Sequence, residues 1–348
     1  MKHRRRSQIV ATMSRCLNTL LLLLFVLYGP GCTSNESSDQ ATSASGKPKN
    51  GTLRIAVIPK GTSHQFWKTV HAGAEAAAKE VGNVEVLWKG PETEADTSGQ
   101  IAVVKNFITN RVDGIVLAPN HSQSLVDVVA EANAENIPVA IFDSGLGSGA
   151  EIVTYVATNN HRGGVLAAEC LAEALGHKGQ VIMLRYNPGS ESTEQREVGF
   201  LEAMAKEKEI EVISSDQYAG TRTEEALAKA TQLLNKYRDQ VDGIFAVCEP
   251  NCNGVLEALN RAGLAGKVKF VGFDSSEPLI RGMSEKTVSG IVLQDPFAMG
   301  RESVLALVKH INKQPVESVI STGEYVATPD NQNQPPFDRL LRPDSFGK

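Results

Sequence analysis

The chain has 348 residues, of which 41% are hydrophobic and 22% are charged, and its formal net charge at pH 7 is −5. This length is enough for two lobes of typical domain size, and the composition excludes a collagen-like or wholly disordered chain. The acidic balance, without a basic cluster in the main body, argues against nucleic acid as a partner.

The first 31 residues have the pattern of an export signal. A cationic start without acidic residues precedes an apolar run over residues 20–28, which is about half the ~20 residues that span a bilayer. Gly29-Pro30-Gly31 then stands directly before Cys32, as at a bacterial lipoprotein cleavage site, although Gly29 replaces the usual aliphatic residue. We expect residues 1–31 to be a lipoprotein signal peptide and Cys32 to bear the lipid. The alternative is an ordinary signal peptide cut nearby, with Cys32 as a spectator.

Residues 32–52 are rich in Ser, Thr, Asn, Gly and Lys and hold almost nothing apolar. Such a segment cannot bury enough surface to fold, so it predicts a disordered tether. The two N-terminal segments together indicate an exported, periplasmic protein that a lipid anchors to a membrane.

Short apolar runs alternate with amphipathic stretches from Leu53 onward. In the first half we predict strands over residues 53–58, 84–88, 114–117 and 138–142, and helices over 64–82, 97–110 and 122–136. In the second half we predict strands over 180–184, 211–214, 243–247 and 269–273, and helices over 161–175, 192–208, 223–237 and 253–262. Thr221 and Glu224 suggest a capping box at one helix start. Continuous apolar strands between helices are typical of a parallel sheet covered on both faces.

The two halves share two short segments. Val112-Asp113-Gly114-Ile115 recurs as Val241-Asp242-Gly243-Ile244, and Phe142-Asp143-Ser144 recurs as Phe273-Asp274-Ser275. Coincidence is one explanation, but two matches in register are better explained by two lobes of one design. Since side chains at the carboxyl ends of parallel strands face the ligand crevice, Asp143 and Asp274 should line one cleft from opposite sides.

Paired carboxylates at a cleft allow more than one chemistry. Asp143 and Asp274 could serve acid–base catalysis or glycoside hydrolysis, or they could accept hydrogen bonds from ligand hydroxyls. Each could also simply cap the turn that follows it. Nothing nearby in the sequence supplies a tuned histidine or a metal cluster, so we favour binding over catalysis.

Two further features fit a ligand with hydroxyl groups. The loop Gly61–Trp67 ends in two adjacent aromatic residues, Phe66 and Trp67, and a flat ring can stack on the C–H face of a sugar. Arg196 lies near a predicted helix start, and its five fixed donors suit several hydroxyls. A surface ion pair of Arg196 with a neighbouring glutamate is an equal alternative.

No cofactor or metal is expected. The glycine-rich stretch from Gly145 to Gly149 lacks the Lys-Ser/Thr ending of a phosphate loop and the third glycine of a dinucleotide fingerprint. Cys248 and Cys252 are four apart, a poor spacing for a disulfide on a helix, and they lack two further ligands for a metal. Small buried residues are the leading interpretation of this pair.

These motifs together resemble a known family. From about Leu53 to Val326 the chain is similar to the type I periplasmic binding proteins of sugar ABC transporters, particularly the ribose-binding group. The motifs are Phe66-Trp67, Ile115-Val116-Leu117-Ala118-Pro119, Ile137-Pro138-Val139 with Phe142-Asp143-Ser144, Thr158-Asn159-Asn160, Arg196 with Gly199-Phe200, Val271-Gly272-Phe273-Asp274, and Gln294.

The resemblance implies a specific architecture. Two doubly wound α/β lobes with parallel sheets would be joined by a hinge of three crossings, near Thr158, near residues 294–296 and near Val319. The N-terminal lobe would hold residues 53–157 plus 296–318. The C-terminal lobe would hold residues 158–295 plus 319–348.

It also implies a ligand pocket, which would be lined by His64, Phe66, Trp67, Asp143, Ser144, Arg196, Thr221, Cys248, Asp274 and Gln294. Three of these residues depart from the ribose pattern, because His64 and Cys248 replace Asn and Ser144 replaces Arg. Each change alters the donors and acceptors that meet the ligand, which puts ribose itself in doubt.

The implied function is that of a solute-binding component, a monomer and not an enzyme. It would close on a small polar ligand, with a monosaccharide expected, and deliver it to the permease subunits of an ABC transporter. One alternative is a lipoprotein that reports the same ligand to a membrane kinase or chemoreceptor. Another is an exported glycoside hydrolase that uses Asp143 and Asp274.

Overall fold

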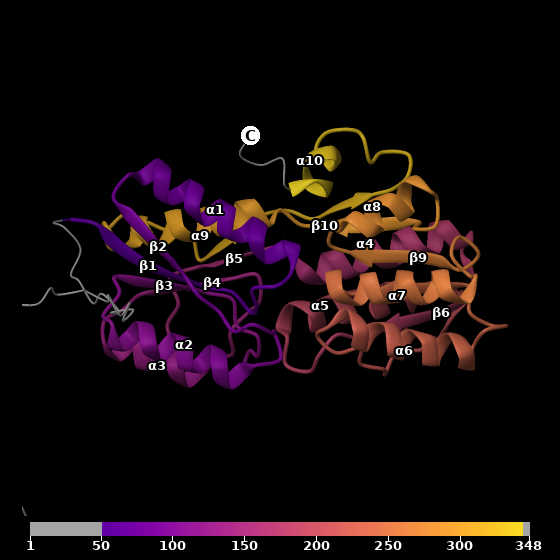
Figure 1. Cartoon of the computed structure of the whole chain (residues 1–348), viewed down its shortest axis with the longest axis horizontal. Helices are drawn as coiled ribbons and strands as arrows, with labels where there is room; N and C mark the ends of the chain where they lie inside the picture. The colour runs from indigo at the N-terminus through magenta and orange to yellow at the C-terminus, as the bar shows by residue number, and fades with distance from the viewer. Residues whose placement is uncertain (1–50, 344–348) are drawn as a thin grey trace, which may run out of the picture. The chain divides into compact units, whose positions relative to one another are not determined.

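Two six-stranded sheets organise residues 51–343, the part of the chain that the computed structural model describes (Figure 1). In the first sheet the strand order is β11-β5-β4-β3-β1-β2, and in the second it is β12-β10-β9-β8-β6-β7. All neighbouring strands run parallel except β12, which is antiparallel to β10. The predicted class, two α/β lobes with parallel sheets, is therefore confirmed.

Apolar runs form the central strands of the first lobe, as predicted, and the two at residues 114–117 and 139–142 are buried along their whole length. Its strands are β1 (Leu53–Ile58), β2 (Val84–Trp88), β3 (Gly114–Leu117), β4 (Val139–Phe142), β5 (Tyr155–Ala157) and β11 (Val319–Ser321). Its helices are α1 (Gln65–Val81), α2 (Thr97–Thr109), α3 (Val126–Ala134) and α9 (Pro296–Ile311). Apolar clusters lie on both faces of this sheet, one beneath α1 and α9 and the other beneath α2 and α3.

The second lobe repeats this plan. Its strands are β6 (Lys178–Leu184), β7 (Glu209–Ser214), β8 (Gly243–Ala246), β9 (Lys269–Phe273), β10 (Gly290–Leu293) and β12 (Tyr325–Ala327). Its helices are α4 (Asn160–Leu175), α5 (Glu191–Met204), α6 (Thr223–Lys236), α7 (Glu249–Ala262), α8 (Glu277–Ser284) and α10 (Phe337–Leu341). Two buried clusters again cover the two faces of the sheet.

The repeated sequence segments occupy equivalent places in the two lobes. The Asp113 carboxylate accepts a hydrogen bond from the backbone N–H of Arg54 at 2.7 Å, and Asp242 accepts one from Gln180 at 2.8 Å. Asp143 and Asp274 follow β4 and β9 with backbone φ angles of 60° and 69°. A left-handed conformation at a non-glycine residue is uncommon, so its presence at both strand ends confirms that one design is used twice.

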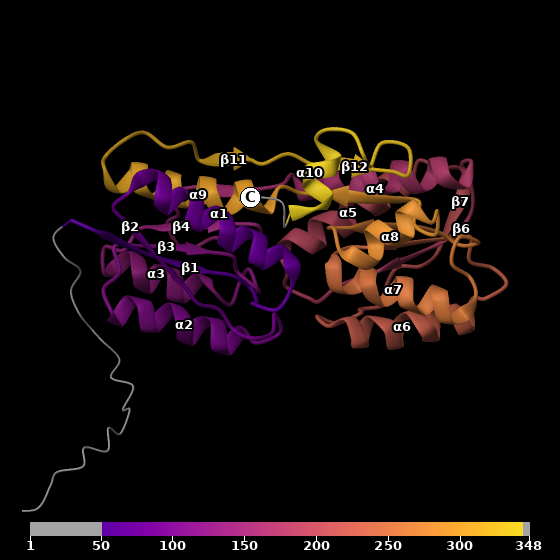
Figure 2. The same cartoon turned by 45° about the horizontal axis from the view of Figure 1, so that its top comes forward.

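The chain passes between the two sheets three times, after β5, after β10 and after β11. Figure 2 shows α9, drawn in orange, lying beside α1 although more than two hundred residues separate them. The expected boundary near Val319 falls slightly too early, because β11 pairs in parallel with β5 and still belongs to the first sheet. A three-residue strand is too short to give a periodic signal in the sequence.

Two helix starts differ by four residues from the sequence-based predictions, helix α5 ends four residues before the predicted end, and one predicted cap does not form. Helix α3 begins at Val126 rather than at residue 122, because the Ser122 N–H binds the Gly189 carbonyl and the chain turns there first. Helix α7 begins at Glu249, four residues before the predicted start. Its second residue is a proline, which is compatible with the first turn of a helix. The predicted Thr221–Glu224 capping box is wrong: Arg222 is the N-cap residue, and Glu225 accepts the Thr221 N–H at 2.9 Å.

A close helix pair holds α1 in place above the first sheet. A Cβ atom built on Gly73 of α1 would lie 2.0 Å from the carbonyl oxygen of Phe297, and one built on Gly300 of α9 would lie 2.0 Å from that of Val70. Glycine at both positions lets the two backbones touch. This contact fixes where the N-terminus of α1 points, and that end bears the aromatic pair.

Candidate ligand-binding site

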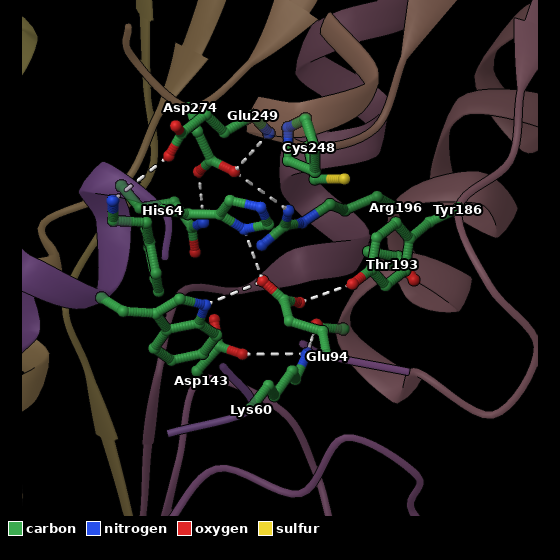
Figure 3. Close-up of a pocket in the computed structure, with 15 residues that line it drawn as sticks. Lys60, His64, Glu94, Asp143, Tyr186, Thr193, Arg196, Cys248, Glu249 and Asp274 are labelled. Atoms are coloured by element: carbon green, nitrogen blue, oxygen red, sulfur yellow. Dashed lines mark hydrogen bonds and ion pairs between the residues drawn. The ribbon is translucent and has the colours of Figure 1, made fainter. Parts of the chain in front are cut away.

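A cavity lies between the lobes at the carboxyl ends of the strands, where the topology predicts a ligand site (Figure 3). The residues that line it are Lys60, His64, Phe66, Trp67, Glu94, Asp143, Tyr186, Ser192, Thr193, Arg196, Cys248, Glu249, Pro250, Asp274 and Gln294. Its volume in this arrangement of side chains is about 30 Å³. Groups from both lobes line it, so parting of the lobes would widen its entrance.

The two matched aspartates line this one cavity, as the repeat predicts. Asp143 forms an ion pair with Lys60, at 3.0 Å between Nζ and Oδ2, and both side chains are almost fully buried. Asp274 accepts a hydrogen bond from Gln294 at 2.6 Å and another from the Glu249 N–H at 3.2 Å. Burial raises the pKa of Asp274, and the charge of Arg196 and the bond from Gln294 only partly offset this.

Phe66 and Trp67 are adjacent on a helix, so their side chains point in different directions. Trp67 is 3% exposed and packs into the core of the first lobe against Phe142, while Phe66 meets its ring edge-on at a centroid distance of 4.9 Å. Both rings reach the cavity. His64, which precedes α1, stands beside them with its Nδ1 2.7 Å from Glu94.

Glu94 is the central polar group that sequence analysis missed. Its carboxylate binds His64 and accepts a hydrogen bond from the Trp67 indole N–H at 2.8 Å. It also accepts a hydrogen bond from the hydroxyl of Tyr186, a residue of the other lobe, at 2.5 Å. Burial alone would raise its pKa. The hydrogen bond and charge of His64, the charge of Lys60 and the bond from Trp67 outweigh burial and lower the pKa of Glu94 to about 2.

His64 responds in the opposite direction. Burial lowers its pKa, but the bond to Glu94 and the nearby charges of Glu94, Glu249 and Asp274 raise it above its ordinary value overall. His64 and Glu94 therefore form a charged pair on the floor of the cavity at mildly acidic pH.

Arg196 is a buried residue of the site and not the surface ion pair of the alternative interpretation. It is 2% exposed, its guanidinium donates to Asn160 and to the Val247 carbonyl at 2.9 Å each, and it lies 3.8 Å from Asp274. The guanidinium also stacks 3.8 Å from the centroid of Phe273. These contacts fix a planar group of donors at the cavity wall.

Eight of the ten predicted pocket residues line the cavity, and two do not. The Ser144 hydroxyl instead accepts the N–H of Ser192, which ties the end of β4 to the start of α5. Thr221 is buried in the second lobe, where its N–H binds Glu225. Both predictions came from the family resemblance, which gave a position in the chain but not the direction of the side chain.

Three of the missed lining residues follow the same rule that found the aspartates. Lys60 comes two residues after β1, Tyr186 two residues after β6, and Glu249 shortly after β8. Strand ends therefore identify these three. Glu94 lies six residues beyond β2, and Ser192 and Thr193 lie in the first turn of α5, so strand ends do not identify them.

Cys248 and Cys252 are buried and free, and burial raises the pKa of each. Among residues 51–343, no group of three or more His, Cys, Asp or Glu side chains is arranged to hold a metal ion. In the same range, no helix has both the length and the apolar character needed to cross a membrane.

The fold and the site define a two-lobed binding protein that encloses a small ligand between strand ends. The chain belongs to the periplasmic binding protein family, since the model of the periplasmic binding protein domain matches residues 55–315.

Its relatives include sugar-binding proteins. It is 27% identical over 310 residues to the ribose import binding protein of Bacillus subtilis, a match that covers 89% of this chain and 97% of that protein. It is 32% identical over 233 residues to the D-ribose/D-allose-binding protein of Pseudomonas aeruginosa, covering 65% and 72% of the two chains. A solved structure of an ABC transporter solute-binding protein from Agrobacterium vitis with bound D-fucose is similar at a TM-score of 0.80 and 32% identity, covering 83% of this chain and 99% of that one.

Proposed function

We propose that this chain is the solute-binding component of a sugar ABC transporter. It closes its lobes around a monosaccharide and delivers the sugar to a membrane permease. The observation that carries this proposal is the position of Asp143 and Asp274, which come from matched strand ends in two lobes and line one cavity. Carboxylates accept hydrogen bonds from sugar hydroxyls, and the Arg196 guanidinium donates hydrogen bonds to the oxygens of those hydroxyls. An aromatic ring covers the C–H face of the sugar.

Eight residues form the proposed ligand contacts: His64, Phe66, Trp67, Asp143, Arg196, Cys248, Asp274 and Gln294. Both lobes contribute, so the ligand completes its contacts only when the lobes are closed. Such a difference in affinity between the open and closed forms is what drives hinged closure. The three crossings between the sheets are the segments that bend.

Catalysis has little support from the geometry. A glycoside hydrolase needs one carboxyl group poised to give up a proton and a second that is free to act as base or nucleophile. Here Asp143 is paired with Lys60, and Asp274 binds Gln294 and the Glu249 N–H. We therefore propose that the protein binds its sugar and releases it unchanged.

The proposed location rests on residues 1–52, most of which lie outside the described residues. The predicted signal peptide and Cys32 would place a lipid-anchored monomer at the membrane, next to its permease. Replacing Cys32 with serine should release the protein from the membrane fraction, and mass spectrometry of the mature N-terminus would identify the lipid.

A sugar panel tests the function directly. D-ribose, D-allose, D-arabinose, D-fucose, D-tagatose and xylitol are added singly, and the melting temperature is recorded. A ligand that binds only the folded protein must raise it. Calorimetry then gives the affinity, and chromatography of the recovered sugar shows whether it was changed. Binding without turnover supports the proposal, while turnover supports a hydrolase and a panel without any binder contradicts sugar transport.

A further inference from the structure

Helix α1 lacks a cap of its own, although its first turn forms one wall of the cavity. The preceding residue, His64, makes no capping bond with its side chain, and the first turn contains no acidic residue. Asp96, Asn159, Ser276 and Asp295 each cap the helix that follows them, whereas α1 shares the lack of a side-chain cap with α3, α5, α6, α7 and α10. Uncapped N–H groups at a buried helix end are costly, so a partner from elsewhere is needed.

The partner comes from the other lobe. One carboxylate oxygen of Glu249 lies 3.2 Å from the backbone nitrogen of Phe66, and the other lies 3.4 Å from that of Gln65. Glu249 is the first residue of α7 and is only 8% exposed. A carboxylate at a helix N-terminus is also favoured by the helix dipole.

This contact can exist only while the lobes are closed. Because the amides belong to the first lobe and the carboxylate to the second, opening the hinge separates them and returns both to water. The backbone of Glu249 is also fixed within the second lobe, because its N–H donates a hydrogen bond to the Asp274 carboxylate at 3.2 Å. The charged groups that act on the Glu249 carboxylate are His64 and Asp274, and Asp274 in turn lies 3.8 Å from Arg196.

We propose that Glu249 is a positioning residue that caps α1 across the cleft and thereby shifts the equilibrium between open and closed lobes. It raises affinity by favouring the closed form and not by recognising a particular hydroxyl. This inference rests on the proposed function, because it assigns a role within the same site.

Two properties distinguish this role from direct recognition. A closing contact contributes equally to every ligand, so its loss should weaken binding of all sugars by one common factor. A recognition contact contributes only to ligands that present the matching hydroxyl, so its loss should change the order of affinities.

The test compares Glu249→Ala and Glu249→Gln with Glu257→Ala, a control on α7 whose side chain is 45% exposed. Calorimetry with each binder in the sugar panel should show a loss of about fivefold for Glu249→Ala, equal across sugars. Glu249→Gln retains one acceptor oxygen and should lose less. The control should match the wild type.

Lobe closure is measured separately with spin labels on Ala102→Cys and Gln232→Cys, which lie on exposed positions of α2 and α6. Without ligand, Glu249→Ala should move the distance distribution toward the open form. A distribution identical to that of the wild type, or a loss of affinity confined to one sugar, would overturn the proposal.

The role of Glu249 can still be tested if the wild type binds no sugar or if the variant does not fold. If the wild type binds no sugar, the proposed function fails, and the ligand-free distance distribution still decides the role of Glu249. If Glu249→Ala does not fold, hydrogen exchange of the wild type replaces it. The Phe66 amide should exchange more slowly with a saturating sugar than without, and equal rates would refute the inter-lobe cap.

Discussion

Replacing Glu94 with glutamine tests the charged pair at the floor of the cavity. The carboxylate is held by His64, Trp67 and Tyr186, and its side chain is 9% exposed. Its pKa of about 2 lies well below the ordinary 4.5. Since a tenfold change in a proton equilibrium corresponds to about 1.4 kcal/mol, the charged form of Glu94 contributes roughly 3 kcal/mol to stability.

The pH window follows from the directions of the two shifts. The pKa of Glu94 is lowered in the folded protein, so its contribution is complete above 4.5 and is lost as the pH falls toward 2. The pKa of His64 is raised, so the contribution of its positive charge is complete below 6.5 and is lost as the pH rises through its raised value. The two groups share one interaction, which is therefore strongest at about pH 5 to 6.

Urea unfolding of the wild type and Glu94→Gln at pH 6 and pH 3 measures this contribution. The variant should be less stable by roughly 3 kcal/mol at pH 6, and about two thirds of that difference should disappear at pH 3. The control is Glu92→Gln, an exposed glutamate two residues away, which should change stability by less than about 0.5 kcal/mol. A difference for Glu94→Gln that is as large at pH 3 as at pH 6 would refute the charged pair.

Three further predictions concern other parts of the molecule. Asp274→Ala should weaken sugar binding at least tenfold in calorimetry while the circular dichroism spectrum stays native, because the ligand loses a charged acceptor (about 1.5–3 kcal/mol). Gly73→Ala should destabilise the protein by more than about 2 kcal/mol in urea unfolding, because its methyl group would press on the Phe297 carbonyl; a neutral effect would contradict the close helix pair. Cys248 and Cys252 should resist alkylation in the native protein and react fully after unfolding, as peptide mass spectrometry would show, and a disulfide-linked peptide would contradict the free thiols.

Most of the fold could be predicted because its signals are local. Apolar runs of four to six residues form the buried strands, and the repeated Val-Asp-Gly-Ile segment marks the same strand in both lobes. Each of its aspartates binds the backbone of the neighbouring first strand of its lobe, which explains why that residue recurs. The repeat also predicted that Asp143 and Asp274 share one cavity.

The parts that could not be predicted depend on side-chain direction and on contacts between lobes. Asp143 turns the chain through a positive φ angle, and the next side chain, Ser144, is fully buried and binds Ser192 instead of lining the cavity. A family pattern supplies the position of such a residue but not this local turn. Glu94 lies in a loop without periodicity, and its importance appears only when Tyr186 from the other lobe meets it.

The cross-lobe contacts also limit how affinity can be interpreted. Lys60 reaches Ser192 at 2.9 Å, Tyr186 reaches Glu94 and Glu249 reaches Phe66, so the first lobe and the second already bind each other around the cavity. A sugar in the cavity meets these same groups and competes with some of these bonds. Its measured affinity is then the difference between the contacts it makes and those it displaces. A pocket substitution that removes a displaced contact can therefore raise affinity, whereas loss of a contact that survives binding, such as the Glu249 cap, must lower it.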